Sequence, residues 1–277
     1  MMNKSLLTVI FIFTLILLRC KNKVDVDTVY KLSQNAYSAQ QFDSCIKCLS
    51  MLDSSAFNDA RLIRLKGLCE FRVGDFDASL LYLNLYLKNN VQDTECLSDR
   101  AFVQYSLRRS RESLQDLRHI LKDYPERTDL RLLEAKVYTD LREYEEAIKD
   151  YQQVLDVDSN NVIAINDIGI IYDILSDFDK AIGFYNRSIR LQDFNAETFY
   201  NRGVSLLHQK KYAESINDFT TAIKLNPNQG LFYYNLGTSL YYLNKNDEAC
   251  QNWNKAFAMG IKDAKETVRE FCDSKIN

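Results

Sequence analysis

The sequence predicts an all-α solenoid of seven helix-turn-helix units closed by a C-terminal capping helix. One pattern of 34 residues repeats seven times over residues 26–263, with no insertion or deletion. Within each unit two helical hydrophobic patterns alternate, separated by a short polar break. A strict period of this length is typical of a solenoid, because one unit cannot bury its own apolar face and needs its neighbours. The small number of glycines (8) and prolines (2) fits nearly continuous helix.

Three columns of equivalent positions define the unit. Small residues fill two columns and bulky residues fill the third, four positions after the second. Small residues at helix crossings let two backbones approach closely, while bulky residues fill the space beside them. The first small column holds Ser33, Gly67, Ala101, Ala135, Gly169, Gly203 and Gly237. The second small column holds Cys45, Ser79, Ser113, Ala147, Ala181, Ser215 and Ala249. The bulky column holds Leu49, Leu83, Leu117, Tyr151, Tyr185, Phe219 and Trp253.

The sixth unit carries a family resemblance most clearly. Its two helices are expected at residues 196–207 and 212–225, and Pro227 follows the second, where proline cannot continue a helix. An aromatic residue, a small residue with glycine, a second aromatic at the start of the second helix and a closing proline resemble the tetratricopeptide repeat (TPR). The resemblance covers residues 26–263 and implies a right-handed superhelical α-solenoid. Units 1–3 depart from the pattern, since they lack an aromatic in the bulky column.

Residues 264–277 follow the last unit and are predicted to form a capping helix and tail. Ala264, Val268 and Phe271 lie on one helical face, with charged residues elsewhere. A solenoid needs an end cap with a polar outer face, and this segment fits that role.

The N-terminus is predicted to be a lipoprotein-type signal peptide over residues 1–19. A short basic start precedes residues 6–18, an apolar run that would span about 20 Å as a helix, shorter than the ~30 Å core of a bilayer. Cys20 closes this run and resembles the lipobox cysteine of bacterial lipoproteins, which implies acylation of Cys20 and residues 20–25 as a short tether. Lipoboxes carry Gly, Ala or Ser before the cysteine, whereas this sequence has Arg19.

Two alternatives for the N-terminus stay open: an uncleaved signal anchor and ordinary secretion. For a bacterial source, every one of these interpretations places the repeats in the cell envelope, facing the periplasm or the exterior. With lipid or signal anchor alike, the protein is expected to be held on a membrane.

The other six cysteines allow several pairings. Cys45 fits a core position, and Cys45 with Cys48 forms a C-x-x-C spacing that can indicate a metal or redox site. No second such pair exists and this one lies within a predicted helix, so we favour neither role. Cys69 is expected near Cys45 or Cys48, and an exported location would allow a disulfide there. Cys250 with Cys272 is a second candidate pair, and Cys96 has no evident partner.

The resemblance implies that the first helix of each unit lines a concave, peptide-binding groove. Asn201 and Asn235 occupy positions where TPR asparagines hydrogen-bond the backbone of an extended peptide. The alternative is that the tyrosines and asparagines at these positions simply pack against neighbouring repeats. Arginines near the other end offer a basic patch for an acidic segment, or a solvated face compensated by Glu95 and Asp99. The candidate groove residues are Tyr200, Asn201, Tyr234, Asn235, Tyr241, Arg61, Arg64, Phe71 and Tyr105.

The sequence carries no motif for catalysis, and we expect neither an enzyme nor a bound cofactor or metal. His119 and His208 are the two histidines, and neither has a metal-ligand spacing. The net charge of −3 argues against a nucleic-acid surface. The expected function is a scaffold that binds a partner protein or peptide, in assembly of an envelope complex. A self-associating structural protein, with a homo-oligomer as its product, is the alternative from a different class.

Overall fold

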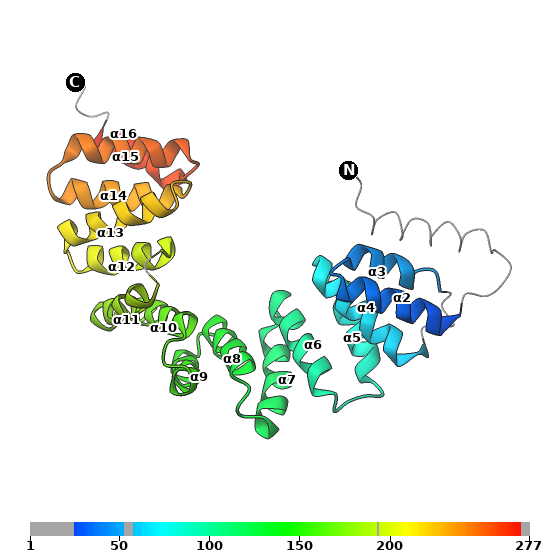
Figure 1. Ribbon diagram of the computed structural model, residues 1–277. Coiled ribbons are helices and arrows are strands. Elements are labelled where there is room, and N and C mark those ends of the chain that lie inside the picture. The colour runs from blue at the N-terminus through cyan, green and yellow to red at the C-terminus, as the bar shows by residue number, and fades with distance from the viewer. Residues whose placement is uncertain (1–24, 53–57, 193, 273–277) are drawn as a thin grey trace. The chain divides into compact units, whose positions relative to one another are not determined.

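A computed structural model describes residues 25–52, 58–192 and 194–272, in which fifteen helices follow one another (Figure 1). Fourteen of them form seven pairs, each made of an A helix and a B helix, and α16 follows the last pair. The described residues contain no strand, so the predicted all-α solenoid class is confirmed. The chain divides after Ile120, within α7, into two compact units, and each unit is described by itself below.

The helices recur with the 34-residue period read from the sequence. The A helices are α2 (Val26–Ser38), α4 (Ala60–Val73), α6 (Thr94–Ser106), α8 (Thr128–Asp140), α10 (Val162–Ile174), α12 (Ala196–His208) and α14 (Gly230–Tyr242). The B helices are α3 (Phe42–Leu49), α5 (Phe76–Leu87), α7 (Ser110–Asp123), α9 (Tyr144–Val157), α11 (Phe178–Leu191), α13 (Tyr212–Leu225) and α15 (Asn246–Ala258). The capping helix α16 (Lys262–Phe271) begins two residues before the expected boundary at 264.

Most A helices begin at an Asp or Asn one residue before the repeat unit. The side chain of this residue accepts a hydrogen bond from a backbone N–H of the first turn, which has no partner inside the helix. The capping residues of this column are Asp25, Asp59, Asp93, Asn161 and Asn195. Arg127 and Gln229 occupy the same column before α8 and α14 and make no such bond.

All members of the three sequence columns are buried, as the period predicts. In the C-terminal unit the fit between columns is tight. A Cβ added to Gly169 would lie 2.7 Å from Tyr185, one on Gly203 would lie 2.8 Å from Phe219, and one on Gly237 would lie 2.7 Å from Trp253. The large aromatics of repeats 5–7 therefore need a glycine opposite them on the A helix.

The turn between the A and B helix uses a left-handed residue at the same position of every repeat. Gly74 has φ 86°, and the six other members are not glycine, with φ between 58° and 62°. A left-handed residue just past a helix end closes the last turn with backbone hydrogen bonds. The column consists of Gln40, Gly74, Arg108, Arg142, Ser176, Lys210 and Asn244.

Successive A helices also contact one another across repeats. In the N-terminal unit α4 contacts both α2 and α6, and in the C-terminal unit α12 contacts both α10 and α14. These contacts are additional to those of each helix with its sequence neighbours. The A helices α2, α4 and α6 in the N-terminal unit, and α10, α12 and α14 in the C-terminal unit, thus form the surface here called the A-helix face.

A recurring polar cluster ties three helices together. Arg202 of α12 forms a two-point ion pair with Asp218 of α13, at 2.7 and 2.6 Å, and donates to Asn186 of α11 at 2.7 Å. Arg100 makes the same contacts with Asp116 and Asn84, three repeats earlier. The ion pair and its hydrogen bonds offset the free energy that it costs to remove the two charges from water.

The predicted signal peptide, Cys20 and most of the tether lie outside the described residues. Among the helices that the structure does describe, none is long and apolar enough to cross a membrane.

Candidate protein-binding face

Tyr200 and Asn235, two of the predicted groove residues, contact each other across repeats 6 and 7. The side-chain amide of Asn235 donates to the Tyr200 hydroxyl at 2.9 Å. The Tyr200 ring stacks on Phe232 with centroids 4.8 Å apart and lies 5.9 Å from Phe219. Burial raises the pKa of the Tyr200 hydroxyl, which therefore stays neutral. Both side chains are engaged in holding α12 against α14.

Tyr234 and Tyr241 of α14 lie against the last B helix and the capping helix. The Tyr241 ring packs 5.6 Å from Trp253 and 5.0 Å from Phe271 of α16. The Tyr234 hydroxyl is 3.3 Å from the hydroxyl of Thr267, also in α16. The indole N–H of Trp253 donates to the Tyr234 carbonyl at 3.1 Å. These two tyrosines thus join repeat 7 to the cap.

Asn201 differs from the other C-terminal candidates, because its side-chain amide has no hydrogen-bond partner among the described residues. It is half-buried on α12. On the neighbouring A helices, Ile163 and Leu231 are 51% and 48% exposed although both are large and apolar. They occupy the same position of repeats 5 and 7, near the start of α10 and α14. A free amide on α12 and exposed aliphatic side chains on the two neighbouring A helices are thus available on this part of the A-helix face.

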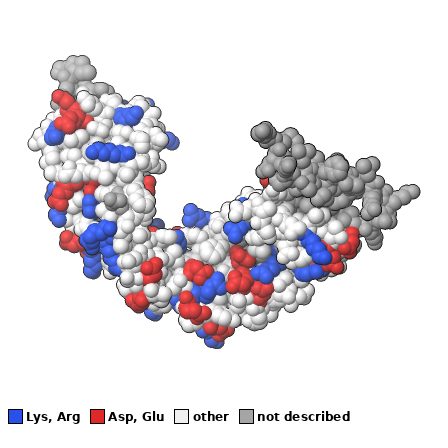
Figure 2. All heavy atoms as spheres, viewed as in Figure 1, with Lys and Arg blue, Asp and Glu red and all other residues white. Residues whose placement is uncertain are grey.

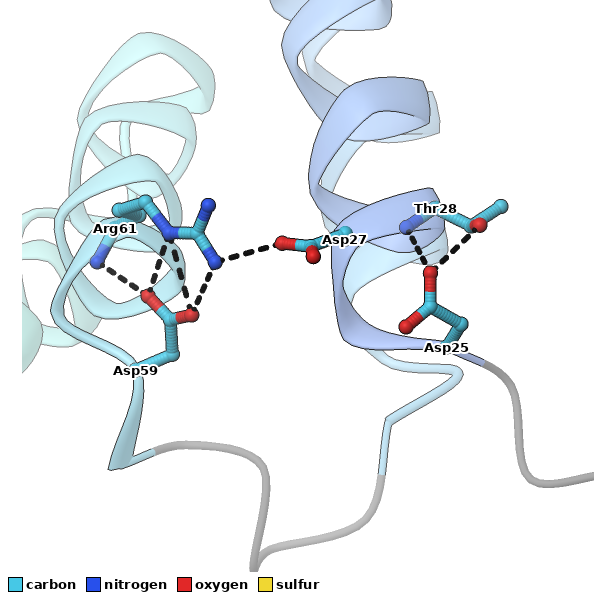
Figure 3. A network of polar contacts seen from close by, with 5 residues as sticks. All are labelled: Asp25, Asp27, Thr28, Asp59 and Arg61. Atoms are coloured by element: carbon cyan, nitrogen blue, oxygen red, sulfur yellow. Dashed lines mark hydrogen bonds and ion pairs between the residues drawn. The ribbon is translucent and has the colours of Figure 1, made fainter.

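In the N-terminal unit Arg61 is neutralised by two carboxylates (Figure 3). Its guanidinium lies 2.7 Å from Asp59, the N-cap of the same helix, and 2.8 Å from Asp27 of α2. These bonds, with Asp59 the larger cause, raise the pKa of Arg61 above its ordinary value. The guanidinium also lies over the Tyr30 ring, 4.9 Å from the centroid. The structure therefore brings Asp27, Tyr30 and Arg61 of the A-helix face together.

Arg64 is likewise compensated. Its guanidinium is 3.5 Å from Asp93 and 5.8 Å from the centroid of the Tyr86 ring. The Tyr86 hydroxyl donates to the same Asp93 carboxylate at 2.7 Å. The Arg64 Nε–H is buried without a hydrogen-bond partner. Instead of an open basic patch, Arg61 and Arg64 form part of an ion-paired surface.

The last two candidate groove residues are Phe71 and Tyr105. Phe71 packs near Phe76 of the next helix, with ring centroids 6.0 Å apart, and the Arg72 guanidinium lies 5.6 Å from the Phe71 ring. Tyr105 is half-buried near the end of α6.

Three partly buried aspartates on the A helices were not among the candidate groove residues. Burial raises the pKa of Asp99, Asp167 and Asp173. Asp173 accepts from the Tyr185 hydroxyl at 2.7 Å and from the Ser205 hydroxyl at 2.6 Å, which links repeats 5 and 6. For Asp167 and Asp173, the signal in the sequence is a pair of aspartates inside the otherwise mostly apolar helix α10.

Acidic and basic side chains intermingle on the face of the molecule shown in Figure 2. Among the described residues, no group of three or more His, Cys, Asp or Glu side chains is arranged to hold a metal ion.

Two family models match the chain inside the helix pairs just described. The model described as tetratricopeptide repeat matches residues 196–229, and a TPR repeat model matches residues 135–173. The chain is a TPR-containing protein. The first matched stretch is the sixth repeat, from α12 to the loop after α13. No curated protein sequence matches significantly.

Solved structures similar to this TPR protein support the same fold. A tetratricopeptide repeat protein from Parabacteroides merdae has a TM-score of 0.67 and 18% identity, covering 91% of this chain and 99% of its own. The C-terminal part of a TPR repeat-containing protein from Cytophaga hutchinsonii has a TM-score of 0.63 and 16% identity, covering 76% and 88%. MamA from Desulfovibrio magneticus has a TM-score of 0.56 and 16% identity, covering 61% and 95%. At these identities the likeness concerns the fold alone.

Proposed function

We propose that this TPR protein is a non-catalytic scaffold whose A-helix face in repeats 5–7 binds a segment of a partner protein. The observation that carries this proposal is the combination of exposed Ile163 and Leu231 with the free amide of Asn201. Large apolar side chains that remain half-exposed on one face of a protein are typical of protein interaction sites. An unpaired amide can donate to and accept from the backbone of an extended peptide.

The chemistry of this face indicates the kind of partner segment. Ile163 and Leu231 are apolar and Asn201 is uncharged, whereas Glu197 holds the position of repeat 6 that is equivalent to Ile163 and Leu231. A segment with apolar side chains and an accessible backbone suits such a surface better than a strongly charged one. Its affinity is expected to depend weakly on salt, since screening acts on charge pairs.

We further propose that the scaffold is tethered to a membrane in the cell envelope through Cys20 and serves assembly of an envelope complex there. The resemblance of residues 1–20 to a lipoprotein signal supports this placement. Two disulfides within the described residues, Cys45–Cys69 and Cys250–Cys272, also support it, because disulfides persist in exported rather than cytosolic proteins. Intact-mass measurement of the membrane-extracted protein tests the tether: a diacylated or triacylated Cys20 is expected, and an uncleaved Met1 would exclude it.

The binding face is tested by crosslinking and pull-down from membranes of the source organism. The variant Ile163→Glu/Leu231→Glu is expected to lose most of the partner recovered by the wild type. Val157→Glu is the matched control, because Val157 is 73% exposed at the end of α9, a B helix. Circular dichroism establishes that each variant is folded. Equal recovery by the wild type and the double variant would rule out this face.

Self-association is a second candidate, and one observation favours it. Tyr242 is 54% exposed, stacks on Tyr212 with centroids 4.8 Å apart, and lies beside Leu243, which is 39% exposed. Light scattering of the purified protein distinguishes the two functions. A monomer at high micromolar concentration would count against self-association and leave the binding proposal intact.

A further inference from the structure

Both disulfides join a B helix to the helix that follows it, at the two ends of the repeat array. Cys45 of α3 pairs with Cys69 of α4, with Cα atoms 6.6 Å apart. Cys250 of α15 pairs with Cys272, the residue that ends α16, with Cα atoms 5.7 Å apart. The first bond therefore holds repeat 1 on repeat 2, and the second holds the capping helix on repeat 7.

The two bonds differ in their access to solvent. Cys45 and Cys69 are both fully buried, in a cluster with Leu49, Leu62 and Leu65. Cys250 and Cys272 are only partly buried, at the edge of the cluster around Trp253. Thiol–disulfide exchange requires a thiolate to reach a disulfide sulfur, so the second bond is open to attack and the first is shielded.

The buried disulfide lies at a position of the repeat where another pair of repeats is joined by noncovalent contacts. Cys45 and Cys69 are equivalent in register to Ser215 and Ser239, whose hydroxyls form a buried hydrogen bond of 2.8 Å between repeats 6 and 7. The A and B helices at that position approach closely whether or not they are covalently linked. The Cys45–Cys69 bond thus reinforces an interface that the repeat already makes.

The capping helix contributes few fully buried side chains to its interface with repeat 7. It has ten residues, and Ala264 is its one fully buried residue. Its other contacts include Phe271, 5.0 Å from Tyr241 and 5.9 Å from Trp253, the Thr267 hydroxyl near Tyr234, and Val268, which packs against the cluster around Trp253. A helix this short is marginal in isolation, so α16 depends on its attachment to α15.

We propose that Cys250–Cys272 is a redox-controlled latch that keeps α16 on the end of the array. A dithiol reductant attacks one sulfur, forms a mixed disulfide and is itself oxidised to a cyclic disulfide, which leaves two thiols at Cys250 and Cys272. Release of α16 then uncovers Tyr234, Tyr241 and Trp253 on repeat 7. A disulfide oxidant accepts the two electrons in the reverse step and closes the latch.

The two unpaired thiols of the described residues do not compete readily with an added reductant. Burial raises the pKa of the Cys48 thiol, and burial with Asp93 nearby raises that of Cys96 to about 12. The thiolate is the attacking species, so both cysteines are poor nucleophiles near neutral pH. Opening of the latch therefore responds to reductant from outside the chain.

The order of reduction is the first test. The full chain is incubated with graded dithiothreitol, trapped with a maleimide under native conditions and mapped by mass spectrometry. Cys250 and Cys272 are expected to be labelled at reductant concentrations that leave Cys45 and Cys69 paired. Simultaneous reduction of both bonds, or earlier loss of Cys45–Cys69, would overturn the proposal.

Release of α16 is the second test. After selective reduction, amide hydrogen exchange over residues 262–271 is expected to accelerate at least about 30-fold, the low end of what a disulfide contributes. Exchange in α12 and α13 is expected to stay unchanged. The fluorescence of Trp253, the single tryptophan, is expected to change in parallel, because Phe271 and the disulfide leave its surroundings.

A variant separates loss of the latch from effects of the reductant itself. Cys250→Ser/Cys272→Ser is expected to show the fast exchange of α16 without reductant and no further change on its addition. Cys48→Ser is the matched control, since it removes a thiol outside both disulfides and is expected to behave as the wild type. Protection of α16 that persists in the double variant would show that noncovalent contacts suffice and would exclude the latch.

Discussion

At the scale of single residues, burial decides the behaviour of Asp99 on α6. Burial, with smaller contributions from Glu95 and Asp93 and against the opposing Arg64 and Arg72, raises the pKa of its carboxyl to about 6. The value in the folded protein is above that of an exposed aspartate, so the folded state binds the proton more tightly than the unfolded state. Stability therefore falls as pH rises from about 4 to about 6, and the cost remains at neutral pH.

Replacement of this carboxyl is expected to relieve that cost. Asp99→Asn should raise the free energy of unfolding by about 1–3 kcal/mol at neutral pH, since a pKa unit corresponds to about 1.4 kcal/mol. Near pH 4 the wild-type carboxyl is itself protonated in the folded state, so the gain should largely vanish. Urea unfolding of both proteins at the two pH values measures the difference. A gain of equal size at both would contradict the explanation by burial of charge.

At the scale of helices, each A–B pair depends on size matching between columns. The Tyr, Phe and Trp side chains of repeats 5–7 fill the space left by the absent Cβ of the glycine opposite. For Gly237 the added Cβ would meet two atoms of the Trp253 indole and, at 3.0 Å, the Ala249 carbonyl oxygen. The backbone contact means that a side-chain rotation alone cannot make room.

Two glycine substitutions test this matching. Gly237→Ala is expected to lower the free energy of unfolding by about 1–3 kcal/mol through overpacking. Gly183→Ala is the control: Gly183 lies in α11, is exposed, and has no atom within 4 Å of an added Cβ. Alanine there should stabilise by up to about 1 kcal/mol, because glycine is a poor helix former. Thermal unfolding followed by circular dichroism compares the two, and opposite signs are expected.

At the scale of the whole molecule, helices contact their neighbours along the chain and the next A helix but few others. Stability in such a solenoid is close to a sum of local terms. The damage of Gly237→Ala should therefore stay near α14, α15 and the helices that touch them. Hydrogen exchange over α4 and α5 is expected to match the wild type, and faster exchange there would indicate coupling over a longer range than these contacts allow.

The repeat made much of the fold predictable. The three columns were read from spacing alone, and every member is buried. The contacts of the candidate groove residues were not predictable from the sequence. Tyr200, Tyr234 and Tyr241 were named as groove residues, yet each makes contacts with a neighbouring repeat or the cap. Asn201 and Asn235 share one position of the repeat, but only Asn235 finds a partner, because a tyrosine lies within its reach.

The left-handed turn residues show a second limit of the sequence. Gln40, Arg108, Arg142, Ser176, Lys210 and Asn244 share that conformation with one glycine, so residue type does not predict it. The conformation follows from the need to reverse the chain between two helices of set spacing.

The sequence by itself determined the period, the order of helices and the burial of the three columns, because each of these depends on spacing within one helix pair. Tertiary structure decided which side chains of neighbouring repeats meet: Cys69 with Cys45 rather than Cys48, Arg61 with Asp27, and Phe271 with Tyr241. Such pairings depend on how one repeat stacks on the next and on the directions of individual side chains. The 34-residue period places equivalent residues in every repeat, so spacing alone does not distinguish residues that contact each other from residues that do not.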